Sequence, residues 1–422
     1  MIDQNILSST LKEQYEAFKN SELGVEREEL HNLKSLIFTP QIIVITGLRR
    51  VGKSTLLKQI AIKYLKEDFY FVNFEDERLL DFEVKDFDLL HETLISLFGE
   101  KKFFLFDEIQ NVPQWERFVR RLHDQGYKFV VTGSNASLLS QELGTRLTGR
   151  SIRVELFPFS FREFLNYRQI NIPDLKVLTT KQRGNLLKLT NEYIASGGIP
   201  DALKYPKLSI HKTLYDDVLY RDIATRYNID NVKILQELAF YLISNISSML
   251  SFNKLKDLLK LGSVNTVKNY ISYLENSWLF FAINKYAYSV KEQQIAAKKL
   301  YCIDTGLAQS VGFSFSKNKG KLMENLVFLT LRRKYDRIYY YKTIQNLEVD
   351  FFVPQKKMLI QVTQKLDLLE TKEREEKALV AVKQELEKIN KLIIVAEGKR
   401  QDIEIRGSKI QVIPLYEWLL QN

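Results

Sequence analysis

The sequence predicts an α/β protein, and three observations lead to this prediction. Several short apolar runs combine β-branched and aromatic residues without charge, which is typical of buried strands. These runs lie at residues 42–45, 69–72, 103–106 and 129–131. Helical stretches separate them, and apolar strands that alternate with helices are typical of a parallel sheet covered on both faces. A further strand is expected at 151–156, after which Pro158 closes the unit.

The length of 422 residues predicts two or three domains. Apolar residues at 45% and charged residues at 27% are ordinary globular values, and 17 Gly with 8 Pro exclude a collagenous or low-complexity chain. Lys and Arg total 62 against 52 Asp and Glu, which gives a net charge of +10. This surplus favours a polyanionic partner such as nucleic acid, and a merely lysine-rich protein stays open as the alternative.

The cysteine and histidine residues exclude a protein held together by internal disulfide bonds and a protein with a structural zinc site. The single Cys302 cannot form an internal disulfide, and the four scattered histidines do not have the spacing of a zinc site.

The first residues lack the basic and apolar order of a signal peptide, and no apolar run approaches 18 residues. We therefore expect a cytoplasmic protein with no membrane partner.

Changes of pattern divide the chain into five parts. Three helical segments followed by an apolar strand near 278–283 have the order of a winged helix-turn-helix, with its third helix at 265–275. After residue 300, a mixture of helices and strands predicts a separate small α/β domain. The expected parts are an N-terminal helical segment (1–37), the sheet core (38–160), a helical lid or connector (161–230), the winged helix (231–300) and the last domain (301–422).

A phosphate-binding loop directly follows the first strand. Residues 47–55 read GLRRVGKST and match G-x-x-x-x-G-K-[ST] between a strand and a helix. Glycines let backbone amides converge on phosphate oxygens, and the next helix presents its positive end to them. We expect Lys53 to bridge the β- and γ-phosphates of ATP and Ser54 to ligate Mg²⁺. The predicted ATP-binding residues are Gly47, Arg50, Gly52, Lys53, Ser54 and Thr55.

Two acids end the third apolar run. Asp107 and Glu108 follow Phe103–Phe106 and should emerge at the carboxyl end of a strand, where open α/β sheets bind ligands. We assign Asp107 to Mg²⁺ and Glu108 to the base that polarises water. The nearby Trp115 is interpreted as a packing anchor.

The following segment supplies further candidates. Ser134 and Asn135 end the next strand and are candidates to contact the γ-phosphate, although helix capping is an equally ordinary role. Arg150, favoured over Arg146, is a candidate to reach the γ-phosphate of a neighbouring subunit, which would require a homo-oligomer. A surface salt bridge is the competing interpretation of Arg150. A base-reading [NT]KxD motif is missing its aspartate at 253–256, so adenine is favoured.

Together these motifs resemble a known family. They read GLRRVGKST, FLFDEIQNVPQWE, VTGSNASLL, LTGR, FPFSFREFL, SGGIPDALK, YRDI, LYCIDTGLA, MENLVFLTLRR and EVDFF. Over about 38–415 the chain is similar to AAA-family ATPases of bacteria and archaea in which a P-loop NTPase domain is fused to a winged helix and a C-terminal domain of unknown function. The resemblance implies ATP binding and hydrolysis, and an oligomeric or DNA-associated role.

The last domain resembles the restriction-nuclease core. Glu324 and Asp350 fit the acids that bind Mg²⁺ there, but Gln361 replaces the third acid and Thr363 replaces the lysine that activates water. Lys365 would substitute for that lysine if the strand continued through it. We expect a degenerate nuclease site that binds without cutting.

Three functions follow as hypotheses. The first is a Mg²⁺-dependent ATPase acting on or near DNA, with Asn265, Thr266, Lys268 and Asn269 of the winged helix as groove contacts. A winged helix also serves protein–protein contacts, which gives the second, a slow nucleotide-gated switch that assembles protein partners. The third is an ATP-regulated nuclease.

Overall fold

A computed structural model describes residues 2–134, 147, 149–313, 319–366, 369–386, 388–405 and 407–421. The chain divides into two units, Met1–Phe157 with Asn276–Trp278 and Pro158–Glu275 with Leu279–Asn422. In the part of the chain that the structure describes, every helix is too short or too polar to span a bilayer.

The first unit contains a five-stranded parallel sheet in the order β2-β3-β4-β1-β5. Each predicted apolar run forms one of its strands, which confirms the predicted parallel α/β sheet. The strands are β1 (Ile42–Thr46), β2 (Phe69–Asn73), β3 (Phe103–Asp107), β4 (Lys128–Gly133) and β5 (Ser151–Glu155). The helices are α1 (Gln4–Asn20), α2 (Glu28–Ile37), α3 (Lys53–Ile60), α4 (Phe87–Phe98) and α5 (Trp115–Asp124).

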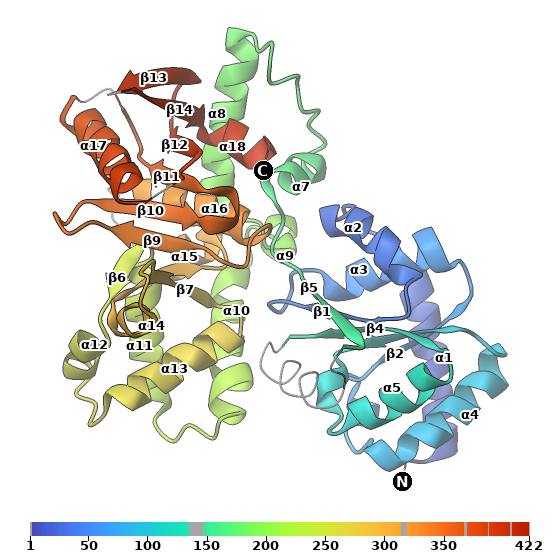
Figure 1. The fold of residues 1–422 in the computed structure, drawn as a ribbon. Coiled ribbons are helices and arrows are strands. Elements are labelled where there is room, and N and C mark those ends of the chain that lie inside the picture. Colours follow the sequence, from blue (N-terminus) through green and yellow to red (C-terminus); the bar gives the residue numbers. More distant parts are fainter. Residues whose placement is uncertain are drawn as a thin grey trace. The chain divides into compact units, whose positions relative to one another are not determined.

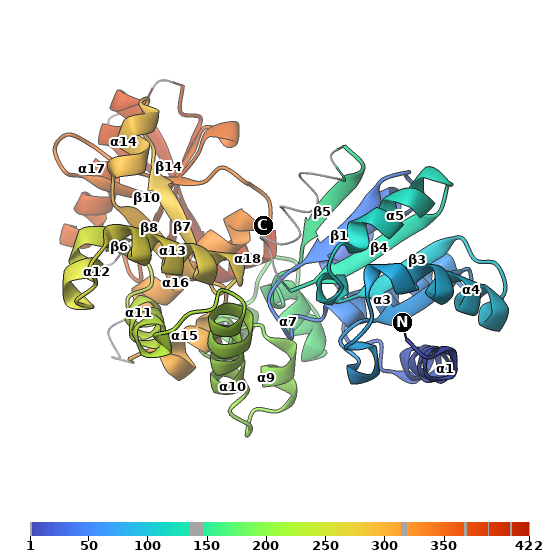
Figure 2. The same ribbon diagram turned by 90° about the horizontal axis from the view of Figure 1, so that it is seen from below.

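Helices cover both faces of this sheet (Figure 1). One face packs against α1, α4 and α5 in a core rich in aromatic rings, among which Phe104 and Phe129 stack at 4.8 Å. Trp115 is fully buried in this core, which fits a packing anchor. The opposite face is covered by α2 and α3, and the view turned by 90° shows α4 and α5 beside the strands of the first face (Figure 2). Burial on both faces explains why the strands are continuous apolar runs.

The second unit begins with helices and ends with a mixed α/β part. Its helices are α7 (Phe161–Tyr167), α8 (Thr180–Ser196), α9 (Pro200–Lys204), α10 (Ile210–Asp217), α11 (Val232–Ser244), α12 (Phe252–Leu258), α13 (Val264–Asn276), α14 (Val290–Ile295), α15 (Thr305–Val311), α16 (Lys319–Arg332), α17 (Leu369–Glu385) and α18 (Leu415–Gln421). Its strands are β6 (Ser248–Leu250), β7 (Phe280–Lys285), β8 (Lys298–Cys302), β9 (Tyr339–Lys342), β10 (Glu348–Val353), β11 (Met358–Val362), β12 (Lys391–Ala396), β13 (Gln401–Ile405) and β14 (Ser408–Pro414).

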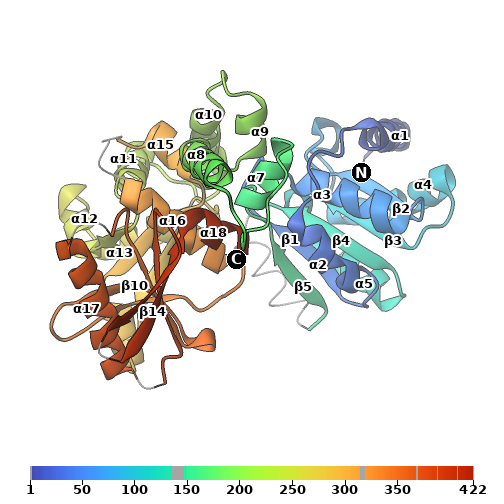
Figure 3. The same cartoon turned by 90° about the horizontal axis from the view of Figure 1, so that it is seen from above.

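One nine-stranded sheet runs through the second unit, in the order β13-β14-β12-β11-β10-β9-β7-β8-β6. We expected residues after 300 to form a separate domain. Instead, β7 pairs with β8 on one side and with β9 on the other, so the sheet crosses that boundary. Helix α17 covers one face of its C-terminal part, and α16 with α18 cover the other (Figure 3).

Two sequence motifs of the second unit meet where α8 ends and α15 begins. Asp304, from LYCIDTGLA, caps α15 by accepting from the amide of Leu307 at 2.8 Å and also accepts from the amide of Gly198, in SGGIPDALK, at 2.6 Å. A Cβ atom on Gly306 would lie 2.1 Å from the carbonyl oxygen of Ser196. The two motifs are therefore explained by one tight crossing of the backbone.

The close approach of these two backbone segments predicts that one methyl group added at Gly306 will lower the stability of the protein. Gly306→Ala should lower the free energy of unfolding by roughly 1–3 kcal/mol, because the backbones must separate to admit the Cβ atom. Gly184→Ala is the matched control, since Gly184 lies in α8 and a Cβ atom there would meet nothing within 4 Å. Helix propensity should raise stability at this control position by about 0.5–1 kcal/mol. Thermal unfolding of both variants measures the difference, and equal melting temperatures would contradict the interpretation.

Candidate functional site

The phosphate loop lies between β1 and α3, as predicted. Gly47 passes so close to the chain after β5 that a Cβ atom would stand 2.3 Å from the carbonyl oxygen of Leu156. At the other end of the loop, Gly52 precedes α3 with φ of +93°, a conformation that favours glycine. Both glycines of the motif are thus required by backbone geometry. The loop backbone can then turn its amides toward an anion at the start of α3.

Lys53 and Glu108 face each other across this loop. The Lys53 ammonium lies 3.1 Å from Glu108 Oε1 and donates to the carbonyl oxygens of Gly47 and Leu48, both at 3.3 Å. Lys53 and Glu108 are both buried. The strand ends of β1 and β3 therefore bring a cation and a carboxylate to one point, as the sequence predicted.

Asp107 lies beside them with a perturbed acidity. Burial and the neighbouring charge of Glu108 raise the pKa of Asp107 to about 6, although hydrogen bonds from Ser54 and Thr132 oppose the shift. The Thr132 hydroxyl donates to Asp107 Oδ1 and accepts from the amide of Glu108 at 3.0 Å. Thr132, in β4, was not predicted from the sequence, and it contacts the carboxylate of Asp107 and the backbone of Glu108.

Glu108 has the opposite shift. Burial alone would raise the pKa of its carboxyl, but the Lys53 ammonium and a hydrogen bond from Gln110 outweigh burial and lower it. Gln110 Nε2 donates to Glu108 Oε2 at 2.5 Å. Glu108 also has φ of +50°, a left-handed conformation that costs a non-glycine residue and is often found at functional sites. An ionised carboxylate is therefore held in a fixed orientation.

The remaining predicted residues fall into two groups. Ser134 is buried after β4, and its Oγ lies 3.5 Å from Gln110 Nε2, so it is near the acids. Arg50 and Ser54 are exposed and Thr55 is partly exposed, on the loop and the first turn of α3. Asn135 and Arg146 lie outside the described residues.

Arg150 lies at the other edge of the sheet. Its carbonyl oxygen accepts from the amide of Ile42, where β1 begins, and its Nε is 3.3 Å from Asp124 Oδ1. Because the strands are parallel, the start of β1 and the phosphate loop are at opposite edges. Within one chain Arg150 makes the surface ion pair that we kept as the alternative. A contact with a neighbouring subunit stays a prediction.

Arg27 is a further residue that the sequence did not reveal. Its buried guanidinium donates to the carbonyl oxygens of Val51, in the phosphate loop, and Phe157, after β5, both at 2.6 Å. Its backbone amide donates to Gln59 of α3. Arg27, which precedes the first strand of the sheet in the chain, thus holds the phosphate loop in place through these hydrogen bonds. A single arginine in a polar helical segment gives no pattern by which to find it.

The donor set of this site fits a magnesium nucleotide. The Ser54 hydroxyl is hydrogen-bonded to the Asp107 carboxylate, so two oxygen ligands of the kind that Mg²⁺ prefers are adjacent. Backbone amides at a helix start and one ammonium group are the donors that phosphate groups take. Ser54 and Asp107 would hold the metal, and Lys53 would contact the phosphates.

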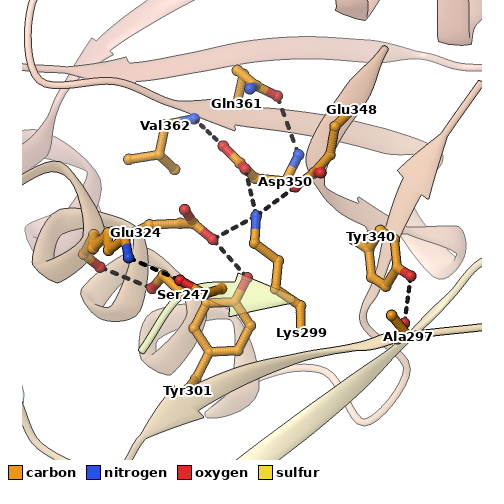
Figure 4. A network of polar contacts seen from close by, with 12 residues as sticks. Ser247, Ala297, Lys299, Tyr301, Glu324, Tyr340, Glu348, Asp350, Gln361 and Val362 are labelled. Carbon is orange, nitrogen blue, oxygen red and sulfur yellow. Dashed lines mark hydrogen bonds and ion pairs between the residues drawn. The ribbon is translucent and has the colours of Figure 1, made fainter. Parts of the chain in front are cut away.

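A second polar cluster occupies the C-terminal part of the second unit (Figure 4). The Lys299 ammonium, from β8, lies 2.7 Å from Asp350 Oδ1, 2.8 Å from Glu324 Oε1 and 2.9 Å from Glu348 Oε1. The Tyr301 hydroxyl donates to the same Glu324 oxygen at 2.8 Å. The predicted pair Glu324 and Asp350 is therefore brought together, around a lysine that was not predicted.

The third predicted element of the nuclease-like site, which carries Gln361 and Thr363, matches the expectation only in part. Gln361 accepts from the amide of Asp350 at 3.1 Å and so belongs to the cluster. The strand ends at Val362, and the amide of Thr363 bonds to the carbonyl oxygen of Val395. Lys365 thus lies beyond the strand and exposed, and the idea that it replaces the missing lysine is wrong. Lys299 supplies the ammonium group from another strand.

Comparison with known proteins identifies the relatives of this chain. A family described as an AAA domain (AAA_14) matches residues 39–165, and two domains of unknown function, DUF8612 and DUF4143, match residues 187–318 and 319–418. An uncharacterized protein of Methanocaldococcus jannaschii (MJ1544) is 37% identical over 100% of this chain and 96% of its own. An uncharacterized protein of Haemophilus influenzae is 30% identical over 95% of this chain and 100% of its own.

Solved structures are more distant. The ORC1 protein of Aeropyrum pernix in complex with DNA is 13% identical, with 70% of this chain and 95% of that chain covered and a TM-score of 0.33. AMPPCP-bound DnaA from Aquifex aeolicus is 16% identical, with 63% and 88% covered and a TM-score of 0.25. Scores this low carry no argument here.

The full-length matches and the loop geometry lead to the same assignment. The chain belongs to the family of these uncharacterized archaeal and bacterial proteins, and its residues 39–165 are a nucleotide-binding AAA domain of the P-loop type.

Proposed function

We propose that this protein is a Mg²⁺-dependent ATPase that acts on or beside DNA. The observation that carries the ATPase proposal is the convergence of three strand ends: Lys53 after β1, Asp107 and Glu108 after β3, and Ser134 after β4. A positive charge for the phosphates and an ionised base for water are the two requirements of phosphate-anhydride hydrolysis. The missing base-reading aspartate at 253–256 favours adenine over guanine.

Each side chain has a separate role in this proposal. Lys53 contacts the β- and γ-phosphates, and Ser54 with Asp107 holds Mg²⁺, which neutralises charge on the phosphates when bound. Glu108 accepts the proton of the attacking water, Gln110 keeps its carboxylate oriented, and Thr132 holds its backbone amide. Ser134 is placed to sense the γ-phosphate. Lys53 must exchange Glu108 for phosphate oxygens, which frees the carboxylate for water.

Removal of the loop ammonium should abolish turnover. Lys53→Ala should lower the ATPase rate by at least about a hundredfold, because one preorganised charge at the transferred phosphate is lost. Lys63→Ala is the control, since Lys63 follows α3 and is 40% exposed in a surface pair with Glu26. A phosphate-release assay on both purified variants tests this, and undiminished hydrolysis by the Lys53 variant would refute the assignment.

Loss of the proposed base, Glu108, should slow ATP cleavage without preventing ATP binding. Glu108→Gln should keep ATP bound and slow its cleavage by at least about a hundredfold, because the amide cannot accept the proton. Equilibrium binding of ATP and single-turnover hydrolysis separate the two effects. Glu77→Gln, at an exposed position of the same unit, removes the same charge as the control. Cleavage at the wild-type rate would show that Glu108 is not the base.

The DNA proposal is supported by the helices between residues 231 and 300. In chain order, α11, β6, α12, α13, β7 and β8 follow the order of a winged helix, with β6 and β7 paired antiparallel to β8. This segment has nine lysines, no arginine and four acidic residues, a net charge of +5. On α13 the side chains of Asn265, Lys268 and Asn269 are exposed, whereas Thr266 is partly covered. Exposed amide and ammonium groups are suited to phosphate and groove contacts.

Salt dependence distinguishes phosphate contacts from protein contacts. Replacing Lys254 and Lys268 by Gln should reduce the slope of log affinity against log salt by about 2, if each contacts one phosphate. Lys181 and Lys188 of α8, also exposed, form the charge-matched control pair. Fluorescence anisotropy with duplex, single-stranded and branched DNA gives the slopes. Salt-independent binding, with an ATPase rate that DNA leaves unchanged, would favour a nucleotide-gated switch that assembles protein partners.

We also propose that Arg150 acts in a neighbouring subunit. It lies at the edge of the sheet opposite its own phosphate loop and is only partly covered by its pair with Asp124. An arginine there supplies charge to a transferred phosphate only across a subunit contact. This role makes a homo-oligomer the active form.

A further inference from the structure

The carboxylates that resemble a nuclease site surround a cation of the chain itself. Lys299 Nζ contacts Glu324, Glu348 and Asp350 at 2.7–2.9 Å. An ammonium group has three N–H donors, and each is taken by a different carboxylate. We propose that the Lys299 ammonium permanently replaces a divalent cation in this cluster, so that the C-terminal part is a metal-independent scaffold and not a nuclease.

The first argument is charge. Buried carboxylates repel one another and need a cation among them. The Lys299 ammonium lies within 2.9 Å of an oxygen atom of each of the three carboxylates, so its positive charge stands between them. The ammonium group thus supplies a cation at the centre of the cluster.

The second argument is that several oxygen atoms of the cluster already accept other hydrogen bonds. Asp350 Oδ2 accepts from the amide of Val362 at 2.9 Å, and the side-chain oxygen of Gln361 accepts from the amide of Asp350. Glu324 Oε1 accepts from Tyr301 as well as from Lys299. Among the residues that the structure describes, no three His, Cys, Asp or Glu side chains form a group that could hold a metal ion.

The third argument is access. The side chains of Lys299, Glu324 and Asp350 are 4%, 11% and 8% exposed, and only Glu348 among the three acids is more open, at 31%. A lysine that activates water in a nuclease must reach a water molecule and a DNA phosphate together. The three N–H donors of Lys299 are all directed to acids, which leaves none for a water molecule or a phosphate. These contacts argue against the ATP-regulated nuclease that the sequence left open.

The same contact has a structural consequence. Lys299 belongs to β8, the last strand of the proposed winged helix, whereas Glu348 and Asp350 belong to β10 and Glu324 to α16. In the sheet, β7 and β9 lie between β8 and β10. The ammonium group therefore joins strands that are not neighbours, and it fixes the helices of 231–300 to the C-terminal strands.

The test is a divalent-cation titration of the full chain without nucleotide. Millimolar Mn²⁺ should leave the melting temperature of the wild-type chain unchanged. Lys299→Met should melt at a lower temperature, and Mn²⁺ should raise this temperature by more than about 3 °C, because the ion binds the freed carboxylates in the folded state only. Adding Asp350→Asn to the Met variant should remove the gain.

Controls separate this cluster from other effects. Lys298→Met removes the same charge from the adjacent position of β8 and should give no response to Mn²⁺. If Lys299→Met does not fold, the double variant Lys299→Met with Glu324→Gln should, because one carboxyl less needs compensation. The proposal is overturned if that rescue fails or if folded Lys299→Met is insensitive to Mn²⁺. It is also overturned if the wild-type chain gains Mn²⁺-dependent stability or nicks plasmid DNA, and Asp350→Asn abolishes the effect.

Discussion

The nucleotide site depends on one close backbone contact. Gly47 can follow β1 into the phosphate loop only because it has no Cβ atom to meet the carbonyl oxygen of Leu156. This contact holds the loop against the chain that leaves β5, and the buried Arg27 joins Val51 of the loop to Phe157 one residue further on. A loop held at both ends keeps its amides oriented before an anion arrives, which reduces the ordering that binding must accomplish.

This arrangement shows why much of the site could be predicted. The strands of the first unit are apolar on both faces and stand out from their neighbours, and parallel strands end at the same edge of a sheet. Lys53, Asp107 and Glu108 could therefore be placed together from local patterns alone. Glu108 and Thr132, which are 24 residues apart, are joined by the pairing of β3 with β4. The role of Thr132 was not predicted, because a strand threonine carries no signal of its own.

Contacts between residues that are far apart in the sequence could not be predicted from such local patterns. Arg27 bonds to residues 24 and 130 positions away, and Lys299 bonds to Asp350 at a separation of 51. Nothing in a lysine-rich chain distinguishes Lys299 from its neighbour Lys298, and β8 itself was not predicted. The interpretation of Lys365 depended on where β11 ends, and strand ends are poorly determined by sequence.

The two lysine–carboxylate clusters differ in a way that bears on function. Lys53 has one carboxylate at 3.1 Å and two carbonyl oxygens at 3.3 Å, and the loop around it carries exposed side chains such as Arg50 and Ser54. Phosphate oxygens can replace such partners, because they offer the ammonium group more negative charge than it gives up. Lys299 has three carboxylates within 2.9 Å, one for each of its N–H donors, so an incoming anion would have to displace a carboxylate. The same pair of chemical groups therefore forms an exchangeable binding site in the first unit and a permanent internal link in the second.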